Sequence, residues 1–292
     1  MLAKKVLYDM AKLAALCYEC KDSVEKDYKT KCCALTGAPF FIDNSNTDCQ
    51  LITGVYKENV SKEVQITRQL VVFRGTESFQ DVLTDLNAFK EPLKLPGFTE
   101  YQRCPEVHEG FLNQFQSVES RLTPIVKESP CPSIIFAGHS LGGALATIAA
   151  VYYSYICPDK DVYCVTFGSP RVGDSFFADV FNKNIIKSYR FVNDNDPIPC
   201  VPSRWRFKHV DGLCWLHQDE LKHEIKAWRF WRFFKNSVLD LFGTGLGYNA
   251  CDDHKCANYI EDVKEVYCGG IDMEMDTDAS HGIKASTDAS HQ

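Results

Sequence analysis

Apolar residues recur along this chain in two alternating patterns. Continuous apolar runs at 132–137 and 162–167, and a similar stretch at 186–192, have the length of strands that are buried on both faces. The segments that follow the first two runs, 141–155 and 175–181, show helical spacing instead. Such alternation predicts a mostly parallel sheet with helices on both faces and right-handed crossovers. We therefore expect an α/β fold.

The amino-terminal part follows a different pattern. Apolar residues at helical spacing predict an amphipathic first helix. These positions are Val6, Met10, Leu13 and Cys17. From there to about residue 60, polar residues and turn formers predict irregular structure, and apolar runs within 64–73 then predict β structure that ends at Gly75.

The carboxyl-terminal part is polar and repetitive. Residues 277–281 (TDASH) recur unchanged at 287–291. Small polar residues without apolar periodicity cannot bury enough surface to become ordered. We therefore predict one folded domain over residues 1–269, followed by a disordered polar tail at 270–292.

Composition and charge exclude several classes of protein. The chain has 292 residues, of which 45% are hydrophobic, and a formal net charge of −7. The acidic balance argues against nucleic acid as a partner. No apolar stretch reaches the ~18 residues of a membrane span, and Asp9 and Lys12 interrupt the apolar start that a signal peptide would have. These features favour the cytoplasm, although 14 cysteines leave an oxidising compartment open.

The cysteines do not predict a metal site. Cys17 and Cys20 form a CxxC pair, but the chain has no second one. Cys251 and Cys256 flank His254 with a spacing that does not suit zinc. We expect buried thiols with a few disulfides, and no metal.

One motif points to nucleophilic catalysis. Residues 138–142 read Gly-His-Ser-Leu-Gly, which matches GxSxG, and they lie between a predicted buried strand and an Ala-rich helix. A nucleophile elbow requires this context, because the serine must project from a tight turn. The helix amino terminus also directs backbone N–H groups toward a developing anion. Ser140 is therefore the candidate nucleophile, whereas its neighbour His139 is expected only to pack.

A serine nucleophile needs a histidine and a carboxylate, and on such sheets these follow it in the order acid, then histidine. Asp196 comes directly after a predicted strand, and Asp194 remains a rival. Among the later histidines, His254 lies in a turn-like cluster, which gives an imidazole reach. His209 lies beside aromatic residues that suggest core packing. His217 and His223 are the remaining candidates before the tail.

Several blocks between about residues 8 and 268 resemble the class 3 lipases, the fungal-type triacylglycerol lipases of the α/β-hydrolase fold. The blocks are AALCY at 14–18, VVFRGT at 71–76, VHEGFL at 107–112, GHSLGG at 138–143, TFGSPRVG at 166–173, NDPIP at 195–199, and DH at 253–254 with Tyr259. Their shared order makes the resemblance specific.

The resemblance implies a role for particular residues. It implies Ser140 as nucleophile, Asp196 as acid and His254 as base. It also implies that the backbone N–H groups of Thr76 and Leu141 form the oxyanion hole, with the Thr76 hydroxyl as a further donor. No cofactor is needed by this chemistry.

Two segments bear on lipid contact. The resemblance implies a lid at about 77–90, with the apolar positions Phe79, Val82, Leu83 and Leu86. The family usually has a tryptophan where this chain has Val82, which bears on the behaviour of the lid at interfaces. A second, basic and aromatic segment at 222–242 has no counterpart among the family blocks, and it suits either core packing or peripheral contact with a membrane or lipid droplet.

The expected function is serine-dependent hydrolysis of carboxylic ester bonds in lipids, as in a triacylglycerol lipase. A phospholipase A1 or a monoacyl- or diacylglycerol hydrolase would use the same triad and remains an alternative. A lipid-binding relative without activity is a third reading. The sequence does not indicate an oligomeric state.

Overall fold

The structure is a computed structural model, which describes residues 2–19, 34–61, 63–76, 89–98, 103–193, 196–217, 220–222 and 254–268. Its helices are α1 (Lys4–Leu16), α4 (Glu109–Glu128), α5 (Leu141–Ile156), α6 (Ser175–Asn184), the short 3-10 helix η1 (Ile198–Cys200) and α9 (Cys256–Cys268). Its strands are β1 (Phe40–Asn44), β2 (Cys49–Asn59), β3 (Gln65–Phe73), β4 (Lys90–Pro92), β5 (Glu106–His108), β6 (Ser133–His139), β7 (Asp161–Phe167), β8 (Lys187–Asn193), β9 (Leu213–His217) and β10 (Glu220–Lys222).

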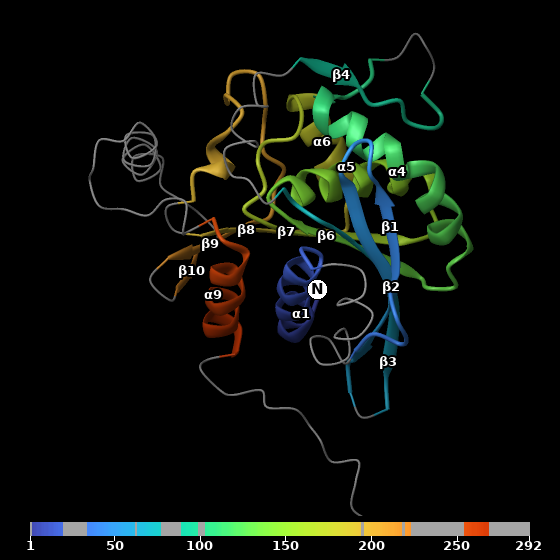
Figure 1. Cartoon of the computed structure of the whole chain (residues 1–292), viewed down its shortest axis with the longest axis vertical. Helices are drawn as coiled ribbons and strands as arrows, with labels where there is room; N and C mark the ends of the chain where they lie inside the picture. Colours follow the sequence, from blue (N-terminus) through green and yellow to red (C-terminus); the bar gives the residue numbers. More distant parts are fainter. Residues whose placement is uncertain are drawn as a thin grey trace, which may run out of the picture.

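A sheet of eight strands organises the described part of the chain, in the order β1-β2-β3-β6-β7-β8-β9-β10 (Figure 1). The strands from β3 to β9 pair in parallel, whereas β1, β2 and β10 pair antiparallel at the two edges. The predicted α/β fold with a mostly parallel central sheet is therefore confirmed. The apolar runs become β6 and β7 because both faces of these central strands are covered.

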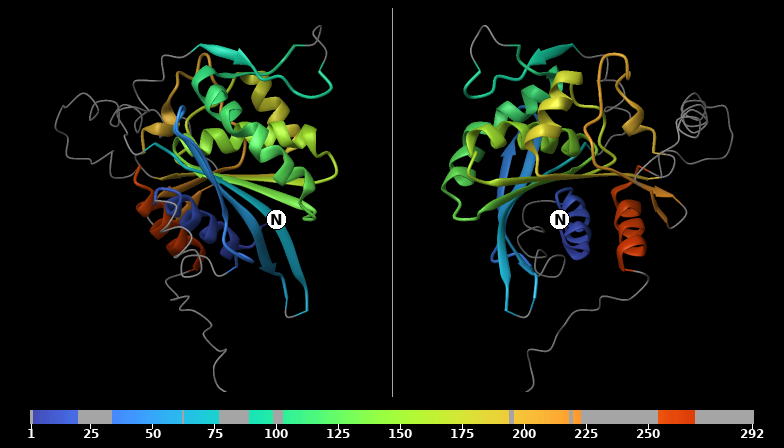
Figure 2. Two further views of the ribbon diagram at one scale, coloured as in Figure 1. Left: turned by 45° about the vertical axis from the view of Figure 1, so that its right-hand side comes forward. Right: turned by 180° about the vertical axis from the view of Figure 1, so that it is seen from behind.

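Helices cover the two faces of the sheet and form separate apolar cores. α4, α5 and α6 lie on one face, and α1 and α9 lie side by side on the other (Figures 1 and 2). The helix-spaced residues of α1 are buried, as expected for an amphipathic helix whose apolar side faces the sheet. α1 packs mainly against β6 and α9 against β8 and β9, and the two helices contact each other on this face.

The prediction of irregular structure after the first helix is wrong for the described residues up to 60. β1 and β2 form an antiparallel pair there, joined by a turn at 45–48. These strands mix polar and apolar residues, because β1 is the edge strand and β1 and β2 both carry exposed positions, and this weakens the sequence signal. The predicted tail at 270–292 lies outside the described residues.

The described helices include none that is both long and apolar enough to span a bilayer.

Candidate active site

A strained turn presents Ser140 between β6 and α5. Its backbone has φ 55° and ψ −125°, a conformation that residues with a side chain rarely adopt. The turn can close only because its flanking residues are glycines: a Cβ on Gly138 would lie 2.3 Å from the carbonyl carbon of Gly142. This is the geometry that a nucleophile elbow requires.

Three side chains that are far apart in the sequence meet at this turn. Nε2 of His254 lies 2.8 Å from Oγ of Ser140, and its Nδ1 lies 2.8 Å from Oδ2 of Asp196. Ser140 and Asp196 are fully buried and His254 is 7% exposed. Because a carboxylate oxygen only accepts hydrogen bonds, Nδ1 of His254 carries the proton, which leaves the Nε2 lone pair facing the serine hydroxyl. Asp194, the rival acid, lies outside the described residues.

The carboxylate of Asp196 is held by further donors. The Tyr259 hydroxyl donates to Oδ2 at 2.6 Å, and the backbone N–H of Ile198 donates to Oδ1 at 2.9 Å. Burial and then the Asp196 charge raise the pKa of Tyr259 well above its usual value, so this hydroxyl remains a donor. Tyr259 marked one family block in the sequence, but no role was predicted for it.

Gly168 leaves the space in which the acid and the histidine meet. Its φ is +59°, and a Cβ there would lie 2.6 Å from Oδ2 of Asp196 and 3.1 Å from Cε1 of His254. A side chain at this position would therefore push apart the two groups that must touch. The glycine follows β7 directly, at the carboxyl edge of the sheet, where β6 and β8 also end.

The two predicted oxyanion donors lie on adjoining segments. Leu141 begins α5, directly after Ser140, so its N–H belongs to the unpaired first turn of the helix. Thr76 follows Gly75, whose Cβ position is 3.3 Å from Cβ of Ser140. The end of β3 also lies against the elbow, because a Cβ on Gly142 would stand 2.3 Å from the carbonyl oxygen of Phe73.

The other histidines have different surroundings. Nε2 of His209 lies 2.6 Å from the carbonyl oxygen of Pro199, and burial, with the nearby charges of Arg190 and Arg171, lowers the pKa of His209 well below its usual value. His139 is buried, and its ring nitrogens bond Tyr18 and the backbone of His254. Each ring thus has a main-chain carbonyl group as a partner, of Pro199 for His209 and of His254 for His139.

Several predicted features lie outside the described residues. These are the lid positions Phe79, Val82, Leu83 and Leu86, the candidate His223, and the basic aromatic segment at 222–242 apart from Lys222. His217 lies in β9.

Several cysteines of the described residues are free thiols. They are Cys17, Cys49, Cys131, Cys157, Cys164, Cys200, Cys214 and Cys256. Burial raises the pKa of the thiols that lie nearest the site, Cys200 and Cys256, to about 12 each, so neither is a thiolate near neutral pH.

Part of the chain is similar in sequence to known lipases. Residues 70–205 match the family described as lipase (class 3). A secreted mono- and diacylglycerol lipase 1 of Fusarium solani is 31% identical over 56% of this chain and 46% of its own length. A lipase of Rhizopus niveus is 33% identical over 50% of this chain and 38% of its own. The chain thus spans less than half the length of either relative.

Solved structures show the same fold. Lipase II from Rhizopus niveus superimposes with a TM-score of 0.60 and 25% identity, covering 73% of this chain and 80% of that one. A triacylglycerol lipase from Penicillium expansum superimposes with a TM-score of 0.58 and 22% identity, covering 73% and 79%. The Fusarium relative is named a secreted lipase, so it does not support the cytoplasmic location that is expected from the sequence. Residues 70–205 are thus similar to the class 3 lipase family, and the described part of the chain shares its fold with solved fungal lipases.

Proposed function

We propose that this protein hydrolyses carboxylic ester bonds in lipids, with Ser140 as nucleophile, His254 as general base and Asp196 as the acid that orients it. The observation that carries the proposal is the unbroken hydrogen-bonded chain from Oγ of Ser140 through both ring nitrogens of His254 to Oδ2 of Asp196. A serine hydroxyl is a weak nucleophile at neutral pH, and this arrangement is what activates it.

In the first half of the reaction, Oγ of Ser140 attacks the ester carbonyl carbon while Nε2 of His254 accepts the hydroxyl proton. The charge that develops on the carbonyl oxygen is stabilised by the N–H groups of Thr76 and Leu141. The imidazolium of His254 is stabilised by Asp196, and it then donates its proton to the leaving alcohol as the carbon–oxygen bond breaks.

The second half repeats these steps with water. His254 accepts a proton from water as the water oxygen attacks the acyl carbon. The tetrahedral intermediate then collapses as the imidazolium returns the proton to Oγ of Ser140, the acyl–oxygen bond breaks, and the fatty acid is released. No cofactor takes part in this scheme. The two N–H donors matter in both halves, since one oxyanion donor is typically worth about 2.7–4 kcal/mol of barrier.

The relatives support a substrate class. The Fusarium protein is named a mono- and diacylglycerol lipase and the Rhizopus proteins are named lipases, which supports acylglycerols as substrates here. A phospholipase A1 activity would use the same three residues. A panel of triacylglycerol, diacylglycerol, monoacylglycerol and phosphatidylcholine, assayed below and above the concentration at which each aggregates, distinguishes these substrates.

A turn at 204–206 supports contact with a lipid surface. Trp205 is 85% exposed, the guanidinium of Arg204 lies over its ring at 5.3 Å from the centroid, and Arg206 is also exposed. The N–H of Phe207, which is buried, donates to the carbonyl oxygen of Ser203 and closes the turn. An exposed aromatic ring between cations suits an interface with anionic lipid, and it contrasts with the net charge of −7 of the whole chain.

One substitution tests the proposed reaction. Ser140→Ala removes the nucleophile and should abolish hydrolysis of a medium-chain ester. Ser154→Ala is the matched control, because Ser154 lies near the other end of α5 and its hydroxyl donates only within that helix, to the carbonyl oxygen of Val151. Turnover by Ser140→Ala close to that of an active Ser154→Ala would refute Ser140 as the nucleophile. No turnover by the unchanged chain or by either variant would instead favour a lipid-binding protein without activity.

A further inference from the structure

The backbone of the proposed base is held by a second histidine. Nε2 of His139 lies 2.7 Å from the carbonyl oxygen of His254, and the two rings lie 4.6 Å apart between centroids. His139 is the last residue of β6, a central strand, and is buried. The carbonyl that it binds lies two residues ahead of α9. The contact therefore joins the rigid sheet to the short segment that carries the base.

The direction of each hydrogen bond follows from chemistry. A carbonyl oxygen only accepts, so Nε2 of His139 carries the proton. Burial, and then the charge of His254, lower the pKa of His139 well below its usual value, so the ring is neutral and its Nδ1 is an acceptor. The Tyr18 hydroxyl lies 2.8 Å from Nδ1 and must therefore be the donor. Tyr18 thus selects the tautomer that can bind the carbonyl of His254.

The same tyrosine also contacts the strand that leads to the oxyanion hole. A Cβ on Gly75 would lie 2.2 Å from the Tyr18 hydroxyl oxygen and 2.5 Å from the carbonyl oxygen of His139. Thr76, a proposed oxyanion donor, is the next residue. The Tyr18 hydroxyl therefore lies where the oxyanion strand, the elbow and the support of the base meet.

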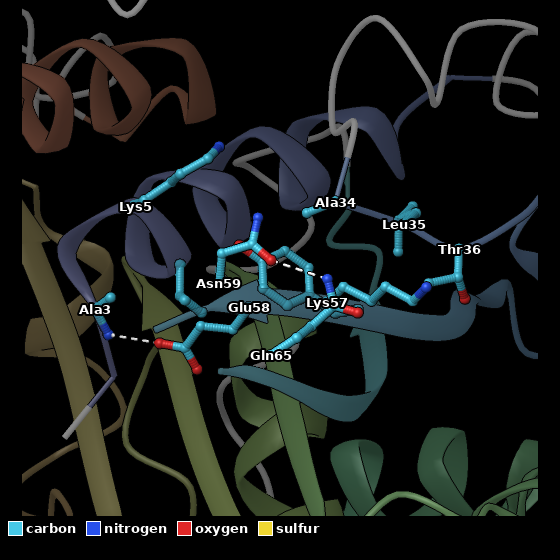
Figure 3. Close-up of a pocket in the computed structure, with 11 residues that line it drawn as sticks. Ala3, Lys5, Ala34, Leu35, Thr36, Lys57, Glu58, Asn59 and Gln65 are labelled. Carbon is cyan, nitrogen blue, oxygen red and sulfur yellow. Dashed lines mark hydrogen bonds between the residues drawn. The ribbon is translucent and has the colours of Figure 1, made fainter. Parts of the chain in front are cut away.

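The helix α1, which precedes Tyr18, is anchored to the sheet at its amino-terminal end. The N–H of Ala3, just before α1, donates to Glu58 at 3.2 Å (Figure 3). Glu58 also forms a buried ion pair with Arg68 at 2.8 Å. Ala3 and Glu58 line a pocket of about 370 Å³, which lies between the start of α1, residues 34–36, β2 and β3. At its other end, the N–H of Tyr18 donates to the carbonyl oxygen of Ala15. The helix is thus tied to the sheet where it begins, and Tyr18 follows directly after its last turn.

We infer that Tyr18 and His139 are positioning residues, which hold the main chain at His254 so that its imidazole reaches both Ser140 and Asp196. Tyr18 donates a hydrogen bond to His139, and His139 donates one to the carbonyl of His254. We call this pair of hydrogen bonds the relay, and it acts through these bonds alone. A neutral ring at this place has a further advantage, because His254 becomes an imidazolium during the reaction and a second positive ring 4.6 Å away would oppose it. The inference rests on the proposed function of this site.

Graded substitutions test the relay. His139→Leu removes both hydrogen bonds and should lower kcat by about 10- to 100-fold with KM within about twofold, because base misplacement affects the transition state more than substrate binding. His139→Gln keeps an N–H near the position of Nε2 and should recover part of that loss. Tyr18→Phe removes only the donor to Nδ1 and should lower kcat by about fivefold.

Tyr56→Phe is the matched control for Tyr18→Phe. The Tyr56 hydroxyl also makes a hydrogen bond with a side chain, to Oδ2 of Asp9 at 2.7 Å, and it is buried on the same side of the sheet but belongs to β2. Its loss should lower stability and leave kcat unchanged. In His139→Leu and Tyr18→Phe, the rate at which a fluorophosphonate modifies Ser140 should fall by the same factor as kcat. A purely structural role of the two residues would not produce this match.

Two results overturn the inference. One is wild-type kcat in both His139→Leu and Tyr18→Phe. The other is a fall in kcat that Tyr56→Phe reproduces, since this would indicate general destabilisation. If Ser140→Ala is inactive in the same assays, either result refutes the relay and leaves the proposed function intact. Activity in Ser140→Ala would instead refute the proposed function, whatever the relay variants show.

Discussion

Tyr259 and His254 share one oxygen atom of Asp196. The tyrosine hydroxyl donates to Oδ2 at 2.6 Å and Nδ1 of His254 lies 2.8 Å from the same atom. The hydroxyl of Tyr259 also accepts the N–H of Asn193 at 2.9 Å, which ties it to the end of β8. Because Tyr259 lies within α9 and His254 lies just before it, one element at the end of the described chain delivers both partners of the buried carboxylate.

Tyr259→Phe should therefore affect stability and catalysis together. The variant loses a hydrogen bond to a charged acceptor, which is worth about 1.5–3 kcal/mol of unfolding free energy. It also frees Asp196 to rotate away from His254, so kcat should fall while KM changes little. Urea unfolding and steady-state kinetics measure the two effects. An unfolding midpoint and a kcat both equal to those of the unchanged protein would contradict this account of the carboxylate.

The central strands and the elbow could be predicted from the sequence because their signals are local. The apolar runs, the two glycines beside Ser140 and the helix that follows lie within one short segment. The roles of Gly168 and Tyr259 could not be predicted, since they depend on which side chains meet in space after the sheet has formed. β1, at the edge of the sheet, and β2, next to it, could not be predicted, because both mix polar and apolar residues, unlike the buried central strands.

The choice between two histidines can be tested directly. His254→Ala removes the group that contacts Ser140 and should lower kcat by about 10⁴- to 10⁶-fold. His209→Ala removes a hydrogen bond to the Pro199 carbonyl, and it should lower the unfolding free energy by about 1–3 kcal/mol with kcat within about tenfold. Kinetics and urea unfolding on both variants check this order. Greater loss of kcat in His209→Ala would mean that His209, and not His254, is the base.

Stability should fall on mild acidification. Burial lowers the pKa of His139 and His209 well below the 6.5 of an exposed histidine. As the pH drops below 6.5, the unfolded chain binds protons at these positions and the folded chain does not, so the unfolding free energy decreases. The slope is at most about 1.4 kcal/mol per pH unit for each histidine, and it ends where the folded protein also binds the proton.

His209→Gln isolates one part of this effect. Glutamine cannot take up the proton, so the variant should lose less stability than the unchanged protein between about pH 7.5 and about pH 5. Urea unfolding at several pH values measures the difference. An identical pH dependence in the two proteins would show that His209 is not kept neutral by the fold.

If the turn at 204–206 contacts lipid, the chain should bind vesicles that carry anionic lipid. In a Ser140→Ala background, which keeps vesicles intact, the full chain should sediment with vesicles that contain phosphatidylglycerol and less with phosphatidylcholine alone. Trp205→Ser should weaken sedimentation, and Arg206→Gln should weaken it by about fivefold, since one cation near an anionic surface contributes about 1 kcal/mol.

Phe40→Ser is the control for Trp205→Ser. Phe40 is 69% exposed but lies on β1, at the edge of the sheet. Its loss should leave vesicle binding unchanged. Equal effects of the two substitutions, or no effect of either, would show that the turn is not the lipid contact.

The central claim is that Ser140 is a nucleophile activated by His254, and covalent labelling tests it most directly. The full chain is treated with a fluorophosphonate, digested, and analysed by mass spectrometry to find the modified residue. The account predicts one phosphonyl adduct, on Ser140, which is lost in Ser140→Ala and forms far more slowly in His254→Ala. An unmodified Ser140, or an equal rate of modification in His254→Ala, would contradict it.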